Sequence, residues 1–184
     1  MPSLTVIAGP NGSGKSSLTC WVEFEGRERL LDPDAIARQL NPADPAAAQV
    51  AAGRAVIQLT DEYLTQQVSF ALETTLSSPG RLAVMRRAKA LGFDARLISV
   101  ALDRPERCMR RIRNRVARGG HFVPDEDVKR RYARSIANAG QALRLADVAY
   151  FYDNSGEGHR LLLVAKCGVV TWHAEALPQW MPPL

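Results

Sequence analysis

The sequence predicts an α/β protein in which helices flank a parallel five-stranded sheet. Two observations lead to this fold class: short apolar runs alternate with segments of helical periodicity, and a glycine-rich stretch follows the first apolar run. Right-handed crossovers through helices make successive strands parallel. With the strands numbered along the chain, we expect the order 2-3-1-4-5 across the sheet.

The predicted strands are short runs rich in apolar residues. They cover Ser3–Ala8, Arg29–Leu31, Gln67–Thr75, Asp94–Leu102 and Val148–Tyr152. The fourth run is apolar along most of its length, which is typical of a central strand that is covered on both faces. After the fifth strand, the runs Leu161–Val164 and Val169–Trp172 predict a small C-terminal hairpin.

Helical periodicity is found in the segments between these strands. The predicted helices cover Lys15–Phe24, Ala35–Leu40, Pro45–Gln67, Gly80–Leu91, Glu106–Arg118 and Asp125–Ala146. In three of them, apolar residues recur at helical spacing and are expected to face the core. These residues are Val50, Ile57 and Leu64, then Leu82, Met85 and Leu91, and finally Ile136, Ala139 and Leu143.

Composition limits the class of protein. A chain of 184 residues that is 46% hydrophobic fits a single domain, residues 1–184, with a core that needs no disulfides. Cys20, Cys108 and Cys167 follow no pairing or metal-ligand spacing, so we expect free thiols in the reducing cytoplasm. No stretch reaches the roughly 18 apolar residues of a membrane span, and no membrane association is expected.

Residues 9–16 read GPNGSGKS, directly after the first predicted strand. This is the GxxxxGKS/T pattern of the P-loop, whose glycines let backbone N–H groups point at phosphate oxygens. Lys15 would reach the β- and γ-phosphates, and the Ser16 hydroxyl would take a Mg²⁺ position. The sequence therefore predicts a P-loop NTPase fold that binds ATP or GTP with Mg²⁺. The predicted nucleotide-binding residues of this stretch are Gly9, Pro10, Asn11, Gly12, Ser13, Gly14, Lys15, Ser16 and Ser17.

Acidic residues follow the second predicted strand. Ligands of parallel sheets bind at the carboxyl ends of strands, so Asp32 and Asp34 are candidates for the site. A carboxylate there could accept the proton of an acceptor hydroxyl or help to hold Mg²⁺. The alternative is that Asp32 is only a helix N-cap, with Pro33 in the first turn.

The third predicted strand ends in Glu73-Thr74-Thr75. A buried acid without a partner is costly, so Glu73 either faces the site, near Mg²⁺ and substrate, or pairs with an arginine. Thr74 and Thr75 are expected on the substrate side, where a hydroxyl could contact the acceptor.

The net charge of +5 comes from one arginine-rich segment, about residues 104–135. Two basic helices joined by Gly119-Gly120 could close as a lid, place cations over a transferring phosphate and exclude water. The candidate arginines are Arg115, Arg118, Arg130, Arg131 and Arg134. For each of them, the alternative is a solvated helix face without a function.

Other motifs narrow the function further. The sequence has neither an apolar run ending in the Asp-Glu pair of motor ATPases nor an NKxD motif for guanine, which favours a small-molecule kinase. His159 and His173 are expected at the surface. Asp153-Asn154-Ser155 either borders the base of the nucleotide or is an ordinary turn.

Four stretches together resemble the zeta toxin family of P-loop kinases, particularly its short members. They are GPNGSGKS, DPDAIA, FALETTLS and RVARGGHFVPDEDVKRRYARSIANA, and the similarity covers about residues 3–155. The resemblance implies transfer of the γ-phosphoryl group of ATP to a hydroxyl of UDP-N-acetylglucosamine, with an antitoxin protein as a partner. It also implies roles for Lys15 as the phosphate-loop lysine, Asp34 as the catalytic base, Arg54 and Thr75 on the substrate side, and Arg115 as a phosphate-binding arginine.

The chain departs from the family pattern at two positions. Ile57 stands near the place of a substrate-contacting glutamate, a role that Glu62 or Glu73 would have to fill. His121, a substrate-side candidate, stands where a second phosphate-binding arginine is expected, and Arg118 or Arg131 would then supply that charge.

Three hypotheses remain open. The first is a kinase of a sugar nucleotide, and the second is a kinase of an antibiotic, a nucleoside or a polynucleotide end. The third is a non-catalytic nucleotide sensor or a nucleic-acid-binding module. Few aromatic residues interleave the arginines, which argues against nucleic acid as a partner.

Overall fold

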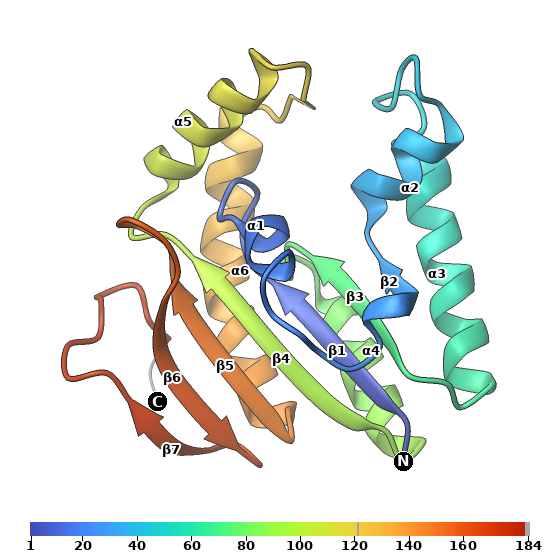
Figure 1. Ribbon diagram of the computed structural model, residues 1–184, viewed down its shortest axis with the longest axis vertical. Helices are drawn as coiled ribbons and strands as arrows, with labels where there is room; N and C mark the ends of the chain where they lie inside the picture. Colours follow the sequence, from blue (N-terminus) through green and yellow to red (C-terminus); the bar gives the residue numbers. More distant parts are fainter. Residues whose placement is uncertain (121, 183–184) are drawn as a thin grey trace.

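The computed structural model describes residues 1–120 and 122–182. Within them, seven strands form one sheet in the order β2-β3-β1-β4-β5-β6-β7 (Figure 1). The five parallel strands are β1 (Ser3–Ala8), β2 (Leu30–Leu31), β3 (Phe70–Thr74), β4 (Asp94–Ala101) and β5 (Val148–Asp153). Their order is the predicted one, so the α/β class and the arrangement of these five strands are confirmed.

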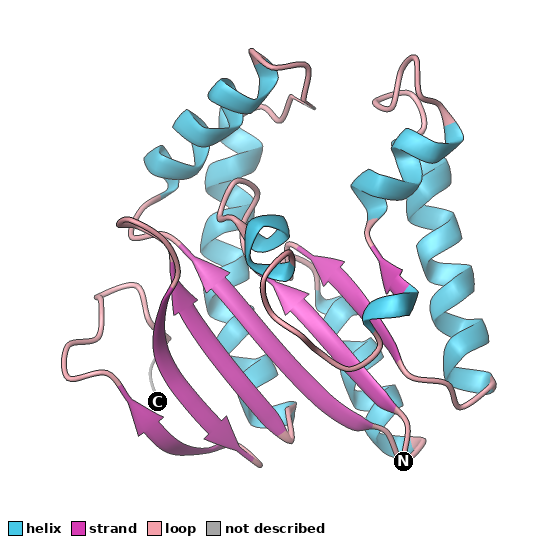
Figure 2. Cartoon of the chain, viewed as in Figure 1, coloured by secondary structure: helices cyan, strands magenta, loops and turns pink. Residues whose placement is uncertain are grey.

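The C-terminal hairpin extends this sheet, so the prediction of a five-stranded, wholly parallel sheet was wrong. β6 (Arg160–Lys166) pairs antiparallel with β5, and β7 (Val169–His173) pairs antiparallel with β6. The result is a mixed sheet, with all strands drawn side by side in Figure 2. Leu162 and Leu163 of β6 are fully buried in the main core cluster. β6 lies between β5 and β7, so β7 forms the edge of the sheet on this side.

The helices begin and end near their predicted bounds. They are α1 (Lys15–Thr19), α2 (Pro33–Leu40), α3 (Gln49–Thr65), α4 (Pro79–Ala90), α5 (Pro105–Val116) and α6 (Asp125–Leu145). The prediction was wrong for α1, which ends well before Phe24. Val22 and Phe24 leave the helix and pack against Leu18 and the β4 residues Ile98 and Val100 instead. A 3-10 turn, η1 (Arg27–Arg29), replaces the first residue of the predicted second strand.

The buried face of α3 differs from the predicted one. Val50 and Ile57 are 69% and 57% exposed, while Leu64 is buried as expected. The residues that α3 buries are Ala52, Val56, Thr60 and Leu64. α2 packs against α3 at Ala52, which is in one cluster with Ala37, while Val56 and Leu64 belong to the main core cluster.

Two other predicted core faces are largely right. In α4, Leu82 and Met85 are buried, but Leu91 lies just beyond the helix and is 42% exposed. In α6, the residues on the predicted face are buried or packed against the core. These are Ile136, Ala139 and Leu143.

Helices cover both faces of the sheet. α4 and α6 pack against each other and against β4 on the face that lies behind the sheet in Figure 1. α1 and the segment after it cover part of the opposite face, where Thr5 of β1 donates a hydrogen bond to the carbonyl oxygen of Glu25. None of the helices in the described part of the chain is long and apolar enough to cross a membrane.

Candidate active site

The P-loop, residues 9–16, joins β1 to α1 at the carboxyl edge of the parallel strands. Gly12 and Gly14 have φ angles of 76° and 96°, in the left-handed region. A Cβ on Gly12 would lie 2.8 Å from the carbonyl oxygen of Cys108, and one on Gly14 would lie 2.1 Å from Nδ2 of Asn154. Both positions therefore require glycine, which is what a loop that turns its N–H groups toward phosphate needs.

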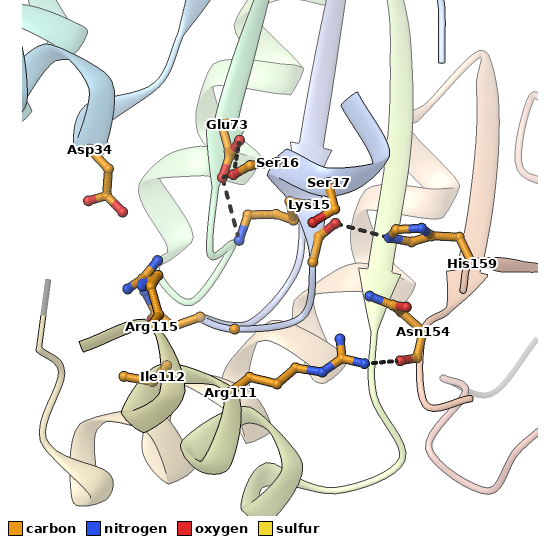
Figure 3. Close-up of a pocket in the computed structure, with 13 residues that line it drawn as sticks. Lys15, Ser16, Ser17, Asp34, Glu73, Arg111, Ile112, Arg115, Asn154 and His159 are labelled. Atoms are coloured by element: carbon orange, nitrogen blue, oxygen red, sulfur yellow. Dashed lines mark hydrogen bonds and ion pairs between the residues drawn. The ribbon is translucent and has the colours of Figure 1, made fainter. Parts of the chain in front are cut away.

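Lys15 and Glu73 form the charged centre of the site (Figure 3). The buried Lys15 ammonium donates to the carbonyl oxygens of Gly9 at 3.0 Å and Pro10 at 3.3 Å, and its Nζ lies 3.8 Å from Oε1 of Glu73. The Ser16 hydroxyl donates to the same carboxylate, at 3.3 and 3.4 Å from its two oxygens. Glu73 thus lies beside Lys15 and Ser16 of the P-loop, and its cationic neighbour is a lysine and not an arginine.

Burial raises the pKa of the Glu73 carboxyl above its ordinary value. Lys15 and the Ser16 hydroxyl lower the pKa, whereas the nearby carboxylates of Asp32 and Asp34 raise it. Asp32 and Asp34 therefore add negative charge near the Glu73–Lys15 pair. A bound divalent cation would relieve their mutual repulsion, and the oxygens of Ser16 and Glu73 are ligands that suit Mg²⁺.

Asp32 and Asp34 have different surroundings at the start of α2. Asp32 is the N-cap of the helix, since its Oδ1 accepts a hydrogen bond from the backbone N–H of Asp34 at 2.9 Å. The Asp34 carboxylate accepts a hydrogen bond from Nε2 of Gln49 in α3 at 3.3 Å and lines the same pocket as Lys15 (Figure 3). Asp32 thus stabilises the helix start that presents Asp34 to the pocket.

A pocket of about 480 Å³ lies over the P-loop, and we call it the P-loop pocket. Asp34 and Glu73 lie on one side of it, and α5 lies on the other. Its lining residues are Asn11, Gly12, Gly14, Lys15, Ser16, Ser17, Asp34, Glu73, Arg111, Ile112, Arg115, Asn154 and His159. The pocket thus combines backbone donors, cations and carboxylates, as phosphoryl transfer requires.

A second cavity of about 240 Å³ adjoins the P-loop on the side of α4 and α6, and Lys15, Asp34 and Glu73 line it as well. The remaining residues of its lining are Asn11, Asp32, Pro33, Gln49, Thr74, Thr75, Ser78, Arg81 and Arg131. The Thr74 hydroxyl accepts a hydrogen bond from the N–H of Leu76 at 3.0 Å, and the Thr75 hydroxyl lies 2.8 Å from that of Ser77. The second cavity therefore collects the residues predicted for the substrate side, with two exceptions.

The exceptions are Arg54 and His121. Arg54 is exposed on α3 and lines neither cavity. The prediction for His121 falls outside the described residues. The substrate side as described is therefore built by the ends of β2 and β3 and by the starts of α2 and α4, not by the middle of α3.

The predicted lid arginines occupy different places. Arg115 lines the P-loop pocket, and it also lines a shallower cavity together with Arg118. Nη1 of Arg131 lies 3.5 Å from Oδ1 of Asn11 and lines the second cavity, while its Nη2 lies 3.6 Å from a carboxylate oxygen of Asp127. The lid segment thus contributes guanidinium groups to both cavities.

Arg130 and Arg134 lie apart from these cavities. Arg130 forms an ion pair with Asp127, at 2.7 Å, and Arg134 is exposed on α6. For these two residues, the alternative of a solvated helix face is the better description.

Sequence reasoning missed three residues that hold the P-loop in place. Nδ2 of the buried Asn154 donates to the carbonyl oxygen of Ser13 at 2.8 Å, and Arg111 donates to the carbonyl oxygen of Asn154 at 2.8 Å. Nε2 of His159 lies 3.0 Å from the carbonyl oxygen of Gly14. His159 is half-buried and lines the pocket, so its assignment to the surface was wrong.

The sequence gives only weak indications that these residues contact the P-loop. Asn154 follows a strand end, a position that the sequence analysis left open between the nucleotide base and a turn. Nothing near His159 indicates a function, because its place depends on β6 returning beside β5. Arg111 is one of many arginines in its helix.

The strand order, the P-loop and the carboxylates at the ends of β2 and β3 define a P-loop protein with a kinase-like fold. Residues 4–136, more than half of the chain, match the model of the AAA domain family, and the chain belongs to this family. An uncharacterized protein of Haemophilus influenzae is 39% identical over 124 residues, which are 67% of this chain and 88% of that protein.

Two solved structures share the fold at low sequence identity. The AvrRxo1-ORF1:-ORF2 complex with ATP matches with a TM-score of 0.74 and 13% identity over 93% of this chain, which spans 60% of that longer chain. The PezAT chromosomal toxin-antitoxin system of Streptococcus pneumoniae matches with a TM-score of 0.65 and 16% identity, over 89% of this chain and 72% of that one. The P-loop kinase-like fold is confirmed by these likenesses, and they go no further than the fold.

Proposed function

We propose that the protein is a phosphotransferase that moves the γ-phosphoryl group of ATP, or of GTP, to an alcohol. The observation that carries the proposal is the convergence of Lys15, Glu73 and Asp34 on one pocket with Arg115 on its opposite side. A P-loop alone would support only nucleotide binding. The addition of a carboxylate from a separate helix supplies a base for the incoming hydroxyl.

Each residue has a defined part in the proposed reaction. The P-loop N–H groups and Lys15 hold the β- and γ-phosphates. The Asp34 carboxylate accepts the proton of the acceptor hydroxyl as that oxygen bonds to the γ-phosphorus, and the bond between the γ-phosphorus and the bridging oxygen breaks. Arg115 stabilises the negative charge of the transferring group, and ADP leaves with the bridging oxygen.

Mg²⁺ fits the residues that face the phosphates. Ser16 and Glu73 would hold the ion, and when bound it would neutralise charge on the β- and γ-phosphate oxygens. Glu73 must be ionised to bind the cation. Because burial raises its pKa, we expect the affinity for Mg²⁺ to decrease with falling pH, beginning at a higher pH than for an ordinary carboxylate.

The resemblance to zeta toxins supports a sugar nucleotide, UDP-N-acetylglucosamine, as the first acceptor to test. The two similar structures carry the names of two-protein assemblies, AvrRxo1-ORF1:-ORF2 and the PezAT toxin-antitoxin system. An antitoxin protein as a partner is therefore part of the same proposal. The proposal also includes a single domain over residues 1–184 and a cytoplasmic location. The three free cysteines agree with a reducing compartment.

The test is a turnover assay with Mg²⁺ and ATP, with and without UDP-N-acetylglucosamine, followed by mass spectrometry for a gain of one phosphate. We expect ATP consumption that depends on the acceptor. Asp34→Asn should lower the rate about 100- to 10,000-fold, the range of general-base catalysis, with little change in ATP affinity. Asp61→Asn, at an exposed carboxylate of α3 that lines neither cavity, is the matched control.

Two results would contradict the proposal at different levels. Equal ATP loss with and without UDP-N-acetylglucosamine would remove that acceptor, and a metabolite extract would then replace it in the same assay. If Asp34→Asn retained full transfer to any acceptor of the extract, Asp34 would not be the base. RNA binding that falls steeply with salt, without any transfer, would favour the nucleic-acid-binding module instead.

A further inference from the structure

Arg81 lies in the first turn of α4, where the sequence analysis assigned no function. It is half-buried at the wall of the second cavity, and burial lowers the pKa of its guanidinium. Among the described residues, no carboxylate or carbonyl oxygen forms an ion pair or hydrogen bond with its side chain. A desolvated cation without an anionic partner costs stability, so this side chain needs an explanation.

The position in the helix adds to that cost. α4 has no acidic residue in its first turn, and Arg81 places a positive charge at the positive end of the helix dipole. The other arginines of α4 show the ordinary arrangement: Arg86 is exposed, and Arg87 forms an ion pair with Asp61. Side chains that break several stability rules at once are typical of functional sites.

Around Arg81, the second cavity holds donors suited to an oxyanion, beside the carboxylates of Asp32, Asp34 and Glu73 that line it as well. A second guanidinium, that of Arg131, and the hydroxyl-bearing residues Thr75 and Ser78 line the same cavity. Guanidinium and hydroxyl groups are the donors that phosphate oxygens accept best. Of the cations that line this cavity, Arg131 already contacts Asp127 and Asn11, and Lys15 is paired with Glu73. Arg81 has no such partner among the described residues, so it is available to a ligand.

The cavity is also connected to the proposed chemistry. Asp34 and Lys15 line both the second cavity and the P-loop pocket. A ligand anchored beside Arg81 would therefore extend toward the proposed base and the γ-phosphate, which is where an acceptor hydroxyl has to be.

We propose that the second cavity is the acceptor site and that Arg81 binds a phosphate group already present on the acceptor alcohol. This inference rests on the proposed phosphotransferase function and adds the residue that binds the phosphate of a phosphorylated acceptor, a class to which a sugar nucleotide belongs. Arg81 is then a specificity residue: it selects acceptors by their charge, while Asp34 acts on their hydroxyl.

The test is a binding experiment that does not depend on catalysis. The P-loop is first saturated with Mg²⁺ and the non-hydrolysable analogue AMPPNP, and inorganic phosphate is then titrated while backbone amide signals of α4 are followed by NMR. We expect phosphate to shift the amide signals of Gly80 and Arg81. Arg81→Gln should weaken this second binding event about 10- to 100-fold, as for the loss of charge-assisted hydrogen bonds.

Two further variants complete the experiment. Arg86→Gln, at the exposed arginine of the same helix, should bind phosphate as the wild type does. Arg81→Lys keeps the charge without the planar fork and should have an intermediate affinity. Unchanged AMPPNP affinity in all three variants shows that they are folded.

The inference is overturned if phosphate does not bind to the AMPPNP complex of the wild type, or if Arg81→Gln and Arg86→Gln weaken its binding equally. Those results would leave the proposed function standing, since AMPPNP binding and the dependence of turnover on Asp34 test it separately. A wild-type protein that does not bind AMPPNP would overturn both.

Discussion

The pairing of Lys15 with Glu73 leads to a quantitative prediction for the protein without nucleotide. In Lys15→Ala, the carboxylate loses its one nearby cation but remains buried beside Asp32 and Asp34. Removing one partner of a buried ion pair typically costs about 3–5 kcal/mol of unfolding free energy, because the remaining charge stays uncompensated. Glu73 can avoid part of this cost by binding a proton, so the destabilisation should depend on pH.

The direction of this dependence follows from the raised pKa of Glu73. Lys15 lowers that pKa in the wild type, so its removal raises the pKa further. Between the pKa of the unfolded chain and the higher pKa of the folded protein, the folded state binds more protons. The free energy of unfolding therefore decreases as pH rises, by up to about 1.4 kcal/mol per pH unit, and becomes constant above the folded-state pKa.

The assay is urea unfolding of the wild type, Lys15→Ala, Glu73→Gln and the double variant at pH values from 5 to 8. Lys15→Ala should lose more stability at pH 8 than at pH 5. The double variant should recover about 2 kcal/mol relative to the sum of the single losses, since no buried carboxylate is left unpaired. The reasoning would be refuted if Lys15→Ala lost the same unfolding free energy at every pH and if the losses of the two single variants summed to that of the double variant.

Two further predictions concern the P-loop and the cysteines. Gly14→Ala should lower nucleotide affinity at least about 10-fold in a fluorescence titration, because the left-handed φ alone costs roughly 1–2 kcal/mol and the new Cβ would lie 2.1 Å from a buried amide. The control is Gly53→Ala, where the Cβ meets nothing within 4 Å. Equal affinity in the two variants would refute this reasoning. Burial raises the pKa of Cys108 to about 12. Iodoacetamide at pH 8 should therefore modify the exposed Cys20 and Cys167, while Cys108 reacts only after unfolding. Three adducts on the folded protein, detected by mass spectrometry, would contradict the burial of Cys108.

The helical faces mark one limit of prediction from sequence. In α3, Val50, Ile57 and Leu64 share a helical period, yet only Leu64 is buried. Periodicity identifies a helix and an apolar stripe, but the neighbouring element decides which stripe is covered. Here α2 packs against Ala52 and the main core covers Leu64, whereas Val50 and Ile57 stay exposed.

In the candidate site, too, some residues were predictable from the sequence and others were not. The P-loop, the capping role of Asp32, and the placement of Glu73 beside Lys15 and of Asp34 in the same pocket agree with expectations from local motifs and strand ends. Arg81 and His159 carry no local signal, because their importance lies in what surrounds them: the second cavity for Arg81 and the carbonyl oxygen of Gly14 for His159.

The sequence by itself determined the class of fold and the phosphate loop. These depend on interactions between near neighbours in the chain: alternating periods of hydrophobicity, glycines at positions of left-handed φ, and a helix cap. Only the tertiary structure decided that the hairpin joins the sheet, which helix faces are buried, and that Arg81 lies half-buried in a cavity shared with Asp34. Burial and the pairing of charges are properties of segments far apart in the chain, and they exist only once those segments have packed.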